Sequence, residues 1–346
     1  MIRFDLSDGS MNAMVNRALS VNEILTEVDE NLAHGRGAAS APISTGFAVL
    51  DTYLSGGLRP GELALLGGPQ GIGKTFFALQ ILRHVAKSGQ GGIYLTYEHD
   101  APTVLGRLIA AEAGEAVGLG AVQLRRIRSA MEATDGGVGG LELRLAGSPG
   151  GLEALATMRE YSPRLFVHRA SGGSTDLGEI ETVIRECRAA MGMAPLVVVD
   201  YLQKVAVPGG SEIEAERVTV VVEGLKDLAL SMQVPILAVV AAEKEGLVGG
   251  TRLRTHHLRG SSSLAYEPDV VLVLHDKYDV VARHHLSFDV GNADRFREWA
   301  VLSIEKNRSG LDHLDVEFRK HLDQGRFEAQ GRPVQETLVD GRVFVQ

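Results

Sequence analysis

Apolar and polar positions follow two different rhythms along the chain from Ile43 onward. Short, almost wholly apolar runs predict strands at Glu62–Leu66, Gly92–Tyr97, Arg164–His168, Pro195–Asp200, Pro235–Ala241 and Val270–His275. Between them, apolar residues at helical spacing predict helices at Thr75–Ser88, from about Ala101, at Leu177–Met191 and at Glu212–Met232. Strands that are apolar on both faces must be covered on both, so this alternation predicts an α/β fold with a mostly parallel, twisted sheet. Trp299–Glu305 and Leu314–Phe318 are expected to be antiparallel edge strands.

The two ends of the chain and one internal stretch follow other patterns. In residues 1–42, Ser20 and Glu23 have the spacing of a capping box in front of a helix. One apolar stripe runs along this helix, made by Val21, Ile24, Leu25, Val28 and Leu32. The stripe packs either on its own domain, the favoured interpretation, or on a neighbouring subunit. We expect one α/β domain at 43–330 and a C-terminal tail at 331–346. The glycines of Asp135–Leu152 predict a flexible loop or an insertion.

The composition limits the class of protein. Of the 346 residues, 45% are hydrophobic, enough for a sizeable core, and no apolar run reaches the length of a membrane span. The net charge of −9 argues against a surface coated with basic residues for nucleic acid, although a basic strip within an acidic body is compatible with it. The single cysteine, Cys187, excludes an internal disulfide. Because the first residues also lack a secretory signal, we expect a cytoplasmic protein.

The strongest chemical signal follows the first predicted strand. Residues 68–75 fit the pattern G-x-x-x-x-G-K-[ST] between a strand and a helix, as that motif requires. They are Gly68, Pro69, Gln70, Gly71, Ile72, Gly73, Lys74 and Thr75. Glycines let successive backbone N–H groups turn toward phosphate oxygens, and the N-terminus of the following helix adds partial positive charge. We expect Lys74 to bind the β- and γ-phosphates of ATP and the Thr75 hydroxyl to bind Mg²⁺.

Two further strands end in carboxylates. Asp200 ends the apolar run at residues 195–200, where the ligand-binding edge of a parallel sheet is expected, so it is the second candidate for Mg²⁺. Glu98 ends the strand after the phosphate-loop helix, where a carboxylate can orient the attacking water. His99 and Asp100 are the competing candidates for that role.

Several segments resemble the motor domain of DnaB-type replicative helicases. They are the entry at 43–47, 50–51 and 56–63, the strand and tail Val199-Asp200-Tyr201-Leu202-Gln203, the segment from Leu258 to Asp269, and the turn Lys306-Asn307-Arg308-Ser309-Gly310. The resemblance covers about residues 20–330. The Asp-Tyr-Leu-Gln and Lys-x-Arg elements are more specific than the phosphate loop alone. The resemblance implies a RecA-like P-loop core in a ring, usually a hexamer, with ATP between subunits.

The same resemblance implies roles for particular residues. Glu98 falls at the family's catalytic glutamate. Lys306 and Arg308 fall where a neighbouring subunit sends positive charge to the γ-phosphate. The linker-like helix at 21–32 takes the place of one that docks on a neighbour.

Three features depart from the family's pattern. The family's N-terminal helical domain is not seen, so loading through a primase or a loader is expected to differ. Ala241 stands near the position of a Ser-Gln pair whose glutamine senses the γ-phosphate, which places the coupling of hydrolysis to DNA movement in question. The start of the phosphate loop, Gly68-Pro69, is more similar to recombinase-type relatives.

A basic stretch falls where the family places a channel loop for single-stranded DNA. Its cations are Lys244, Arg252, Arg254 and Arg259. Lysine and arginine would neutralise phosphates without reading sequence. No aromatic residue is interleaved with them, so base stacking by this loop is not expected. His256 and His257 lack the further ligands that a metal site needs.

The sequence thus favours a Mg²⁺-dependent ATPase ring that binds and translocates on single-stranded DNA. The alternative is a RecA-like regulatory or recombination-accessory ATPase without helicase activity, which Ala241 favours. A scaffold that binds nucleotide without hydrolysing it is disfavoured, because Lys74, Thr75, Asp200 and Glu98 are all present.

Overall fold

A computed structural model describes residues 18–35, 37, 41–136, 139–243, 252–287 and 290–340 of the chain. The chain divides into two units, Met1–Ala41 and Pro42–Gln346. The first unit contains the helix α2 (Val21–Ala33), and the predicted capping box is confirmed. The Ser20 hydroxyl accepts a hydrogen bond from the Glu23 amide at 3.2 Å, and the Glu23 carboxylate accepts one from the Ser20 amide at 2.8 Å. The surface that the apolar stripe of α2 packs against stays a prediction.

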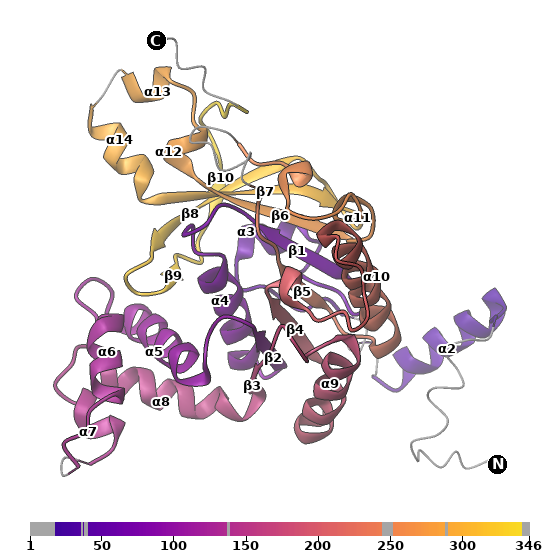
Figure 1. The fold of residues 1–346 in the computed structure, drawn as a ribbon, viewed down its shortest axis with the longest axis horizontal. Helices are drawn as coiled ribbons and strands as arrows, with labels where there is room; N and C mark the ends of the chain where they lie inside the picture. Colours follow the sequence, from indigo (N-terminus) through magenta and orange to yellow (C-terminus); the bar gives the residue numbers. More distant parts are fainter. Residues whose placement is uncertain are drawn as a thin grey trace. The chain divides into compact units, whose positions relative to one another are not determined.

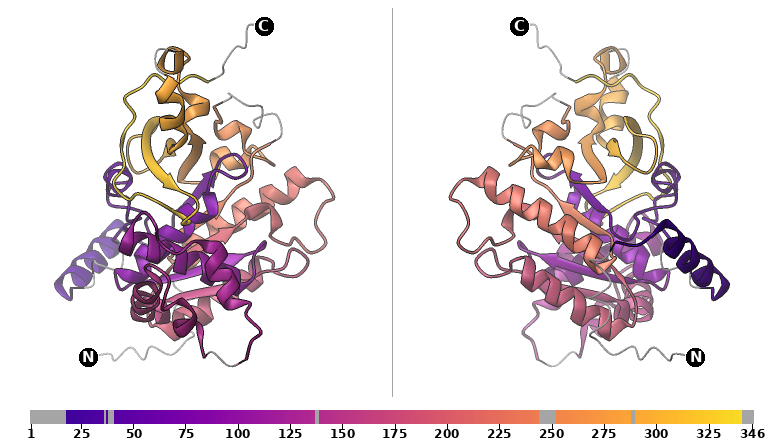
Figure 2. Two further views of the ribbon diagram at one scale, coloured as in Figure 1. Left: turned by 90° about the vertical axis from the view of Figure 1, so that its left-hand side faces the viewer. Right: turned by 90° about the vertical axis from the view of Figure 1, so that its right-hand side faces the viewer.

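The second unit is built on one twisted sheet (Figure 1). Six strands are parallel: β1 (Leu63–Gly67), β2 (Gly91–Thr96), β3 (Leu165–Arg169), β4 (Pro195–Asp200), β5 (Ile236–Val239) and β6 (Val270–Asp276). Their order across the sheet is β6-β1-β5-β4-β2-β3. Antiparallel strands continue the sheet beyond β6: β7 (Trp299–Asn307), β8 (Leu314–His321), β9 (Arg326–Phe327) and β10 (Arg332–Pro333). Figure 2 shows these late strands in orange and yellow at one end. The predicted fold class is confirmed.

Helices cover both faces of this sheet because its central strands are apolar on both sides. Leu66 of β1 packs in one hydrophobic cluster with Phe77, whereas its neighbour Leu65 packs in the other with Leu225. The first cluster belongs to the face of α4 (Lys74–Lys87), α5 (Ala101–Val117) and α8 (Gly151–Tyr161). The second belongs to the face of α9 (Leu177–Met191) and α10 (Glu214–Met232). Alternating side chains of each strand therefore supply two separate cores.

Shorter helices connect these elements. They are α3 (Ala48–Tyr53), α6 (Leu124–Met131), α7 (Leu141–Leu145), η2 (Ser162–Arg164), η3 (Leu202–Lys204), η5 (Thr255–His257), α11 (Ser263–Tyr266), α12 (Lys277–Val280), α13 (His284–Ser287) and α14 (Val290–Arg297). None of the helices in the described part of the chain has both the length and the apolar character that crossing a membrane requires.

Two predicted irregular regions are more ordered than their sequences indicate. The glycine-rich stretch 135–152 includes α7 and the first residues of α8. Within the expected tail, Arg332 and Pro333 form β10, which pairs with β8. The Thr337 carbonyl also accepts a hydrogen bond from the Ala282 amide at 2.9 Å. Strand β10 thus covers part of the outer edge of β8.

Candidate active site

The phosphate loop occupies the turn between β1 and α4. Gly68, Gly71 and Gly73 have φ angles of 146°, 81° and 102°, which favour glycine. A Cβ atom on Gly68 would stand 2.6 Å from the carbonyl oxygen of Leu274, so a side chain is also excluded there by space. The predicted loop, residues 68–75, therefore has the curled backbone that turns N–H groups toward an anion.

Lys74 begins α4 and lies over the loop. Its ammonium donates hydrogen bonds to the carbonyl oxygens of Gly68 at 2.8 Å and Pro69 at 2.9 Å. Burial lowers the pKa of Lys74 to about 8, although the negative charges of Asp200 and Glu98 oppose that shift. A partly desolvated cation at this place attracts an anion strongly, because water screens it little.

Asp200 meets Thr75 at the end of β4. The Thr75 hydroxyl donates to Oδ2 of Asp200 at 2.7 Å, and the Tyr94 phenol donates to the same oxygen at 2.6 Å. Burial and the neighbouring negative charge raise the pKa of Tyr94 well above its usual value, so the phenol remains a donor. A hydroxyl and a carboxylate are hard oxygen ligands, and their meeting beside a phosphate loop fits Mg²⁺.

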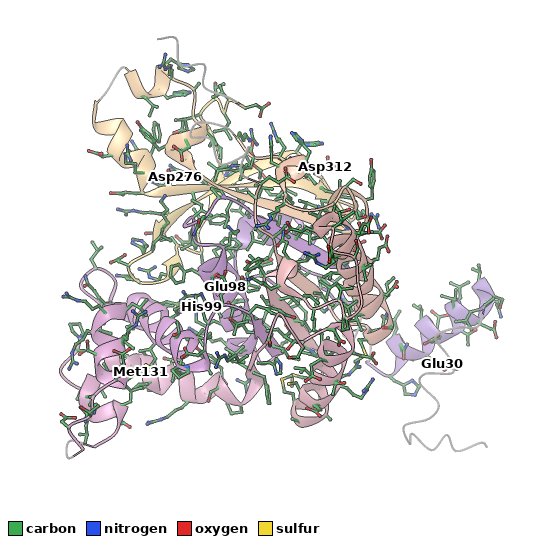
Figure 3. The ribbon with its side chains drawn as sticks, viewed as in Figure 1. Glu30, Glu98, His99, Met131, Asp276 and Asp312 are labelled. Atoms are coloured by element: carbon green, nitrogen blue, oxygen red, sulfur yellow. The ribbon has the colours of Figure 1, made fainter. Side chains whose placement is uncertain are left out.

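Glu98 and its two competitors differ in their surroundings. Glu98 lines the same cavity as Lys74 and Asp200. Asp100 instead caps α5, where its carboxylate accepts a hydrogen bond from the Thr103 amide at 2.9 Å. Figure 3 shows Glu98 and His99 side by side after β2. The geometry favours Glu98 as the water-orienting group, because neither His99 nor Asp100 is among the described residues that line the cavity, and Asp100 already caps α5.

A cavity of about 850 Å³ unites the predicted groups. The predicted residues that line it are Gly68, Gln70, Gly71, Gly73, Lys74, Thr75, Glu98, Asp200 and Arg259. Ala241 also lines it and offers no side-chain donor. The Ala241 amide instead donates to the side-chain oxygen of Gln203 at 3.3 Å, and Gln203 donates to the Arg259 carbonyl oxygen at 2.8 Å.

Arg107 of α5 also lines this cavity and was missed by sequence reasoning. Its guanidinium lies over the Phe76 ring at 5.2 Å, and burial lowers its pKa. Within the described structure, its Nε and Nη1 atoms are buried without a hydrogen-bond partner. A buried guanidinium that lacks partners suits an anionic ligand. The available signal was an arginine within an otherwise apolar stretch of helix, nine positions after Glu98.

Lys306 and Arg308 lie away from this cavity. They stand beside the amino ends of the parallel strands, whereas the cavity lies at the carboxyl ends. Strand β7 runs antiparallel to β6 and pairs Asn307 with Val270, the first residue of β6. Figure 3 shows Asp312, from the same turn as Arg308, far from Glu98. The Arg308 guanidinium contacts the Asp269 carboxylate at 3.2 Å, and the Lys306 ammonium donates to the Ala265 carbonyl oxygen at 2.8 Å. One chain therefore does not bring these cations to its own phosphate loop.

The predicted DNA-contacting cations have unequal surroundings, and Lys244 lies outside the described residues. Arg252 is 7% exposed and binds Ser303 and Asp315, which corrects the expectation of a cation on an open loop. Arg254 pairs with Glu305 at 2.9 Å, and Arg259 pairs with Glu214 at 2.8 Å. The sequence did not reveal these carboxylates because they come from distant segments. DNA binding by Arg254 and Arg259 stays a prediction.

Comparison with known proteins adds to this geometry. Residues 42–328 match the family model described as DnaB-like helicase C terminal domain. The replicative DNA helicase DnaB of Pasteurella multocida is 26% identical over 235 residues, which cover 67% of this chain and 46% of that protein. The chain spans about half the length of the curated relatives it matches.

Two solved structures have the same fold. One, described as an ATPase domain, aligns with a TM-score of 0.69 and 18% identity, over 90% of this chain and 99% of that one. "The Structure Of A DnaB-Like Replicative Helicase And Its Interactions With Primase" aligns with a TM-score of 0.65 and 19% identity, over 90% of this chain and 67% of that one. The RecA-like P-loop fold follows from these similarities.

Proposed function

Because the chain belongs to the family of DnaB-like helicase C-terminal domains, we propose that it is a Mg²⁺-dependent ATPase that assembles into a ring and translocates on single-stranded DNA. The observation that carries this proposal is the cavity shared by Lys74, Thr75, Asp200 and Glu98. These are a phosphate-binding cation, two oxygen ligands and a carboxylate for water. Hydrolysis of ATP needs these groups in one place and no covalent intermediate.

The phosphate loop and Lys74 bind the triphosphate. Backbone N–H groups of the loop point at phosphate oxygens, and the N-terminus of α4 adds partial positive charge. The Lys74 ammonium exchanges the carbonyl oxygens of Gly68 and Pro69 for phosphate oxygens, which are stronger acceptors because they are charged.

Thr75 and Asp200 would hold the metal ion. Their oxygen atoms lie 2.7 Å apart, beside the loop that binds the phosphates. When bound, Mg²⁺ neutralises charge on the β- and γ-phosphates. Glu98 orients the attacking water and accepts its proton. Arg107, from the same chain, offers an unsatisfied guanidinium to the negative charge that moves during the reaction.

The remaining positive charge comes from the next subunit. Lys306 and Arg308 cannot serve the site of their own chain, because they lie at the opposite edge of the sheet. The Arg308 side chain is 50% exposed, so it can leave Asp269 and reach another molecule. A ring of identical subunits, which we propose to be a hexamer, would repeat this contact at each interface and close upon itself.

Single-stranded DNA is the nucleic acid along which the proposed ring translocates. The family resemblance and the cations Arg254 and Arg259 support this part of the proposal, whereas the burial of Arg252 gives that residue a structural role. Contacts to the phosphate backbone would be independent of sequence and weaken with salt.

The alternative function is a RecA-like ATPase that regulates or assists recombination without unwinding DNA. Ala241 in the cavity wall favours it, because no side-chain donor there reports the state of the γ-phosphate. The experiment that separates the two is the ATPase rate with and without single-stranded DNA. Stimulation by DNA supports translocation, turnover without stimulation supports the alternative, and absence of turnover contradicts both.

A further inference from the structure

Strand register brings Tyr94 beneath the metal-binding carboxylate. In the parallel pair of β2 and β4, Tyr94 lies opposite Val198. Side chains two positions apart on a strand point to the same face, so Asp200 shares that face with Val198. Tyr94 is thus a diagonal neighbour of Asp200, at a separation that an aromatic side chain can span.

The two carboxylate oxygens of Asp200 have different contacts. Oδ2 accepts the Tyr94 phenol at 2.6 Å and the Thr75 hydroxyl at 2.7 Å. Among the described residues, no side chain or amide donates a hydrogen bond to Oδ1. Donors from two elements, β2 and α4, therefore fix one oxygen of Asp200, and Asp200 lines the cavity with its other oxygen not engaged by these donors.

The hydroxyl of Tyr94 lies in apolar surroundings, where it needs a hydrogen-bond partner. The residue is fully buried within the hydrophobic cluster beneath α4 and α5. A hydroxyl in such a place costs stability unless it forms a hydrogen bond, and a phenylalanine would fill almost the same space. The phenol donates a strong hydrogen bond to a carboxylate oxygen of Asp200, and this bond offsets the cost of burying the hydroxyl.

We propose that Tyr94 is a positioning residue for magnesium binding, because its phenol orients the carboxylate of Asp200. This inference rests on the proposed nucleotide function and deepens it. Thr75 both donates a hydrogen bond to Oδ2 of Asp200 and supplies a proposed metal ligand with its own oxygen. Tyr94 only donates a hydrogen bond to Oδ2, from the side away from the nucleotide. Partners of this kind contribute to metal affinity by fixing the ligand before the metal arrives.

The test is equilibrium binding of a fluorescent ADP analogue to the full chain during titration with Mg²⁺, and again in excess EDTA. In Tyr94→Phe, the Mg²⁺ concentration at the midpoint of the transition to tight binding should rise about tenfold, as for other partners of metal ligands. Binding in EDTA should not change, because the phosphate loop and Lys74 are intact. Tyr94→Met, which also lacks the hydroxyl, should show the same selective loss.

Tyr161→Phe is the matched control. Tyr161 is 1% exposed in the same hydrophobic cluster but does not contact Asp200, so its variant should match the wild type in both titrations. An unchanged Mg²⁺ midpoint in Tyr94→Phe overturns the inference. Equal losses with and without Mg²⁺ also overturn it, as does unfolding of both Tyr94 variants while Tyr161→Phe remains folded, since Tyr94 would then be a purely structural residue. A wild-type chain that binds no nucleotide would instead contradict the proposed function itself.

Discussion

The parallel strands begin along one side of the sheet, here called the amino edge, and end along the other, the carboxyl edge. Charged groups at these two edges have opposite surroundings. At the carboxyl edge, Lys74 and Asp200 are largely buried and bound to neighbours within a few residues of the strand ends. At the amino edge, Arg308 is half exposed, and its guanidinium contacts the Asp269 carboxylate and the Tyr266 carbonyl oxygen. The first edge is preorganised for a ligand within one chain. In the proposed ring, the second would supply its half-exposed cation to another subunit.

Asp269 explains why the second edge is ordered before any partner arrives. Its carboxylate also accepts hydrogen bonds from the Lys226 ammonium and the Leu63 amide, both at 2.8 Å. The Arg308 amide donates to the Asp269 carbonyl oxygen at 2.9 Å. The turn is therefore attached to the start of β1 and β6, and the half-exposed Arg308 side chain lies against it through Asp269 and the Tyr266 carbonyl oxygen. In the proposed ring, this difference between the edges would separate residues that complete a site of their own chain from residues that complete a neighbour's site.

Loss of Lys74 should break the first edge and have the largest effect. Lys74→Ala removes the charge that binds phosphate, so both nucleotide binding and turnover should be abolished. The fold should persist, because the ammonium bonds only to loop carbonyls. Lys87→Ala, at the other end of α4, is the control and should retain turnover. Near-normal hydrolysis by a folded Lys74→Ala chain would contradict the proposed role of the loop.

Loss of Arg308 should impair hydrolysis and leave binding intact. An arginine supplied across an interface contributes roughly 10³–10⁵ in rate, or about 4–7 kcal/mol of barrier. Arg308→Ala should therefore bind the fluorescent ADP analogue normally and hydrolyse ATP slowly. The control is Arg319→Ala, which removes another surface arginine paired with a carboxylate. If binding and hydrolysis fall together, Arg308 supports the fold and is not a shared catalytic group.

Glu98→Gln should have a smaller effect on the rate, roughly 10²–10⁴-fold, as for other general bases. The amide keeps the shape of the side chain, so ATP binding should be retained. Asp100→Asn tests the competing candidate and should retain turnover and the stability of α5, because an asparagine oxygen can still accept the Thr103 amide. Rates measured at saturating ATP decide between them, and slow turnover in Asp100→Asn alone would transfer the role to Asp100.

The smallest expected effect concerns DNA. In Arg254→Ala and Arg259→Ala, each lost phosphate contact should flatten the dependence of log affinity on log salt by about 0.7 for single strands. Arg252→Ala should lower the thermal unfolding temperature and leave that slope unchanged, because Arg252 is buried against Ser303 and Asp315. Fluorescence anisotropy with a labelled oligonucleotide at several salt concentrations measures the slopes. Unchanged slopes in the first two variants would exclude those arginines from the DNA interface.

Local sequence predicted the carboxyl edge well, because its information is local. The predicted strand that ends at Asp200 has the same bounds as β4. The glycines of the phosphate loop are sequence neighbours of Lys74, so the motif could be recognised locally. Arg107 was missed because its place in the cavity depends on how α5 packs over Phe76. Arg252 was misjudged for the converse reason, since the groups that bury it come from β7 and β8. Tertiary contacts between distant segments carry no local signal.

Mixing two inactive variants tests most directly the claim that the active site is shared between subunits. Glu98→Gln subunits lack the catalytic carboxylate and keep Arg308, whereas Arg308→Ala subunits have the reverse defect. If Arg308 acts on a neighbour's nucleotide, mixed rings contain some interfaces with both groups intact, and ATPase activity should partly return as the two are combined. Mixtures that stay inactive at every ratio, although the variants demonstrably assemble together, would contradict the shared site.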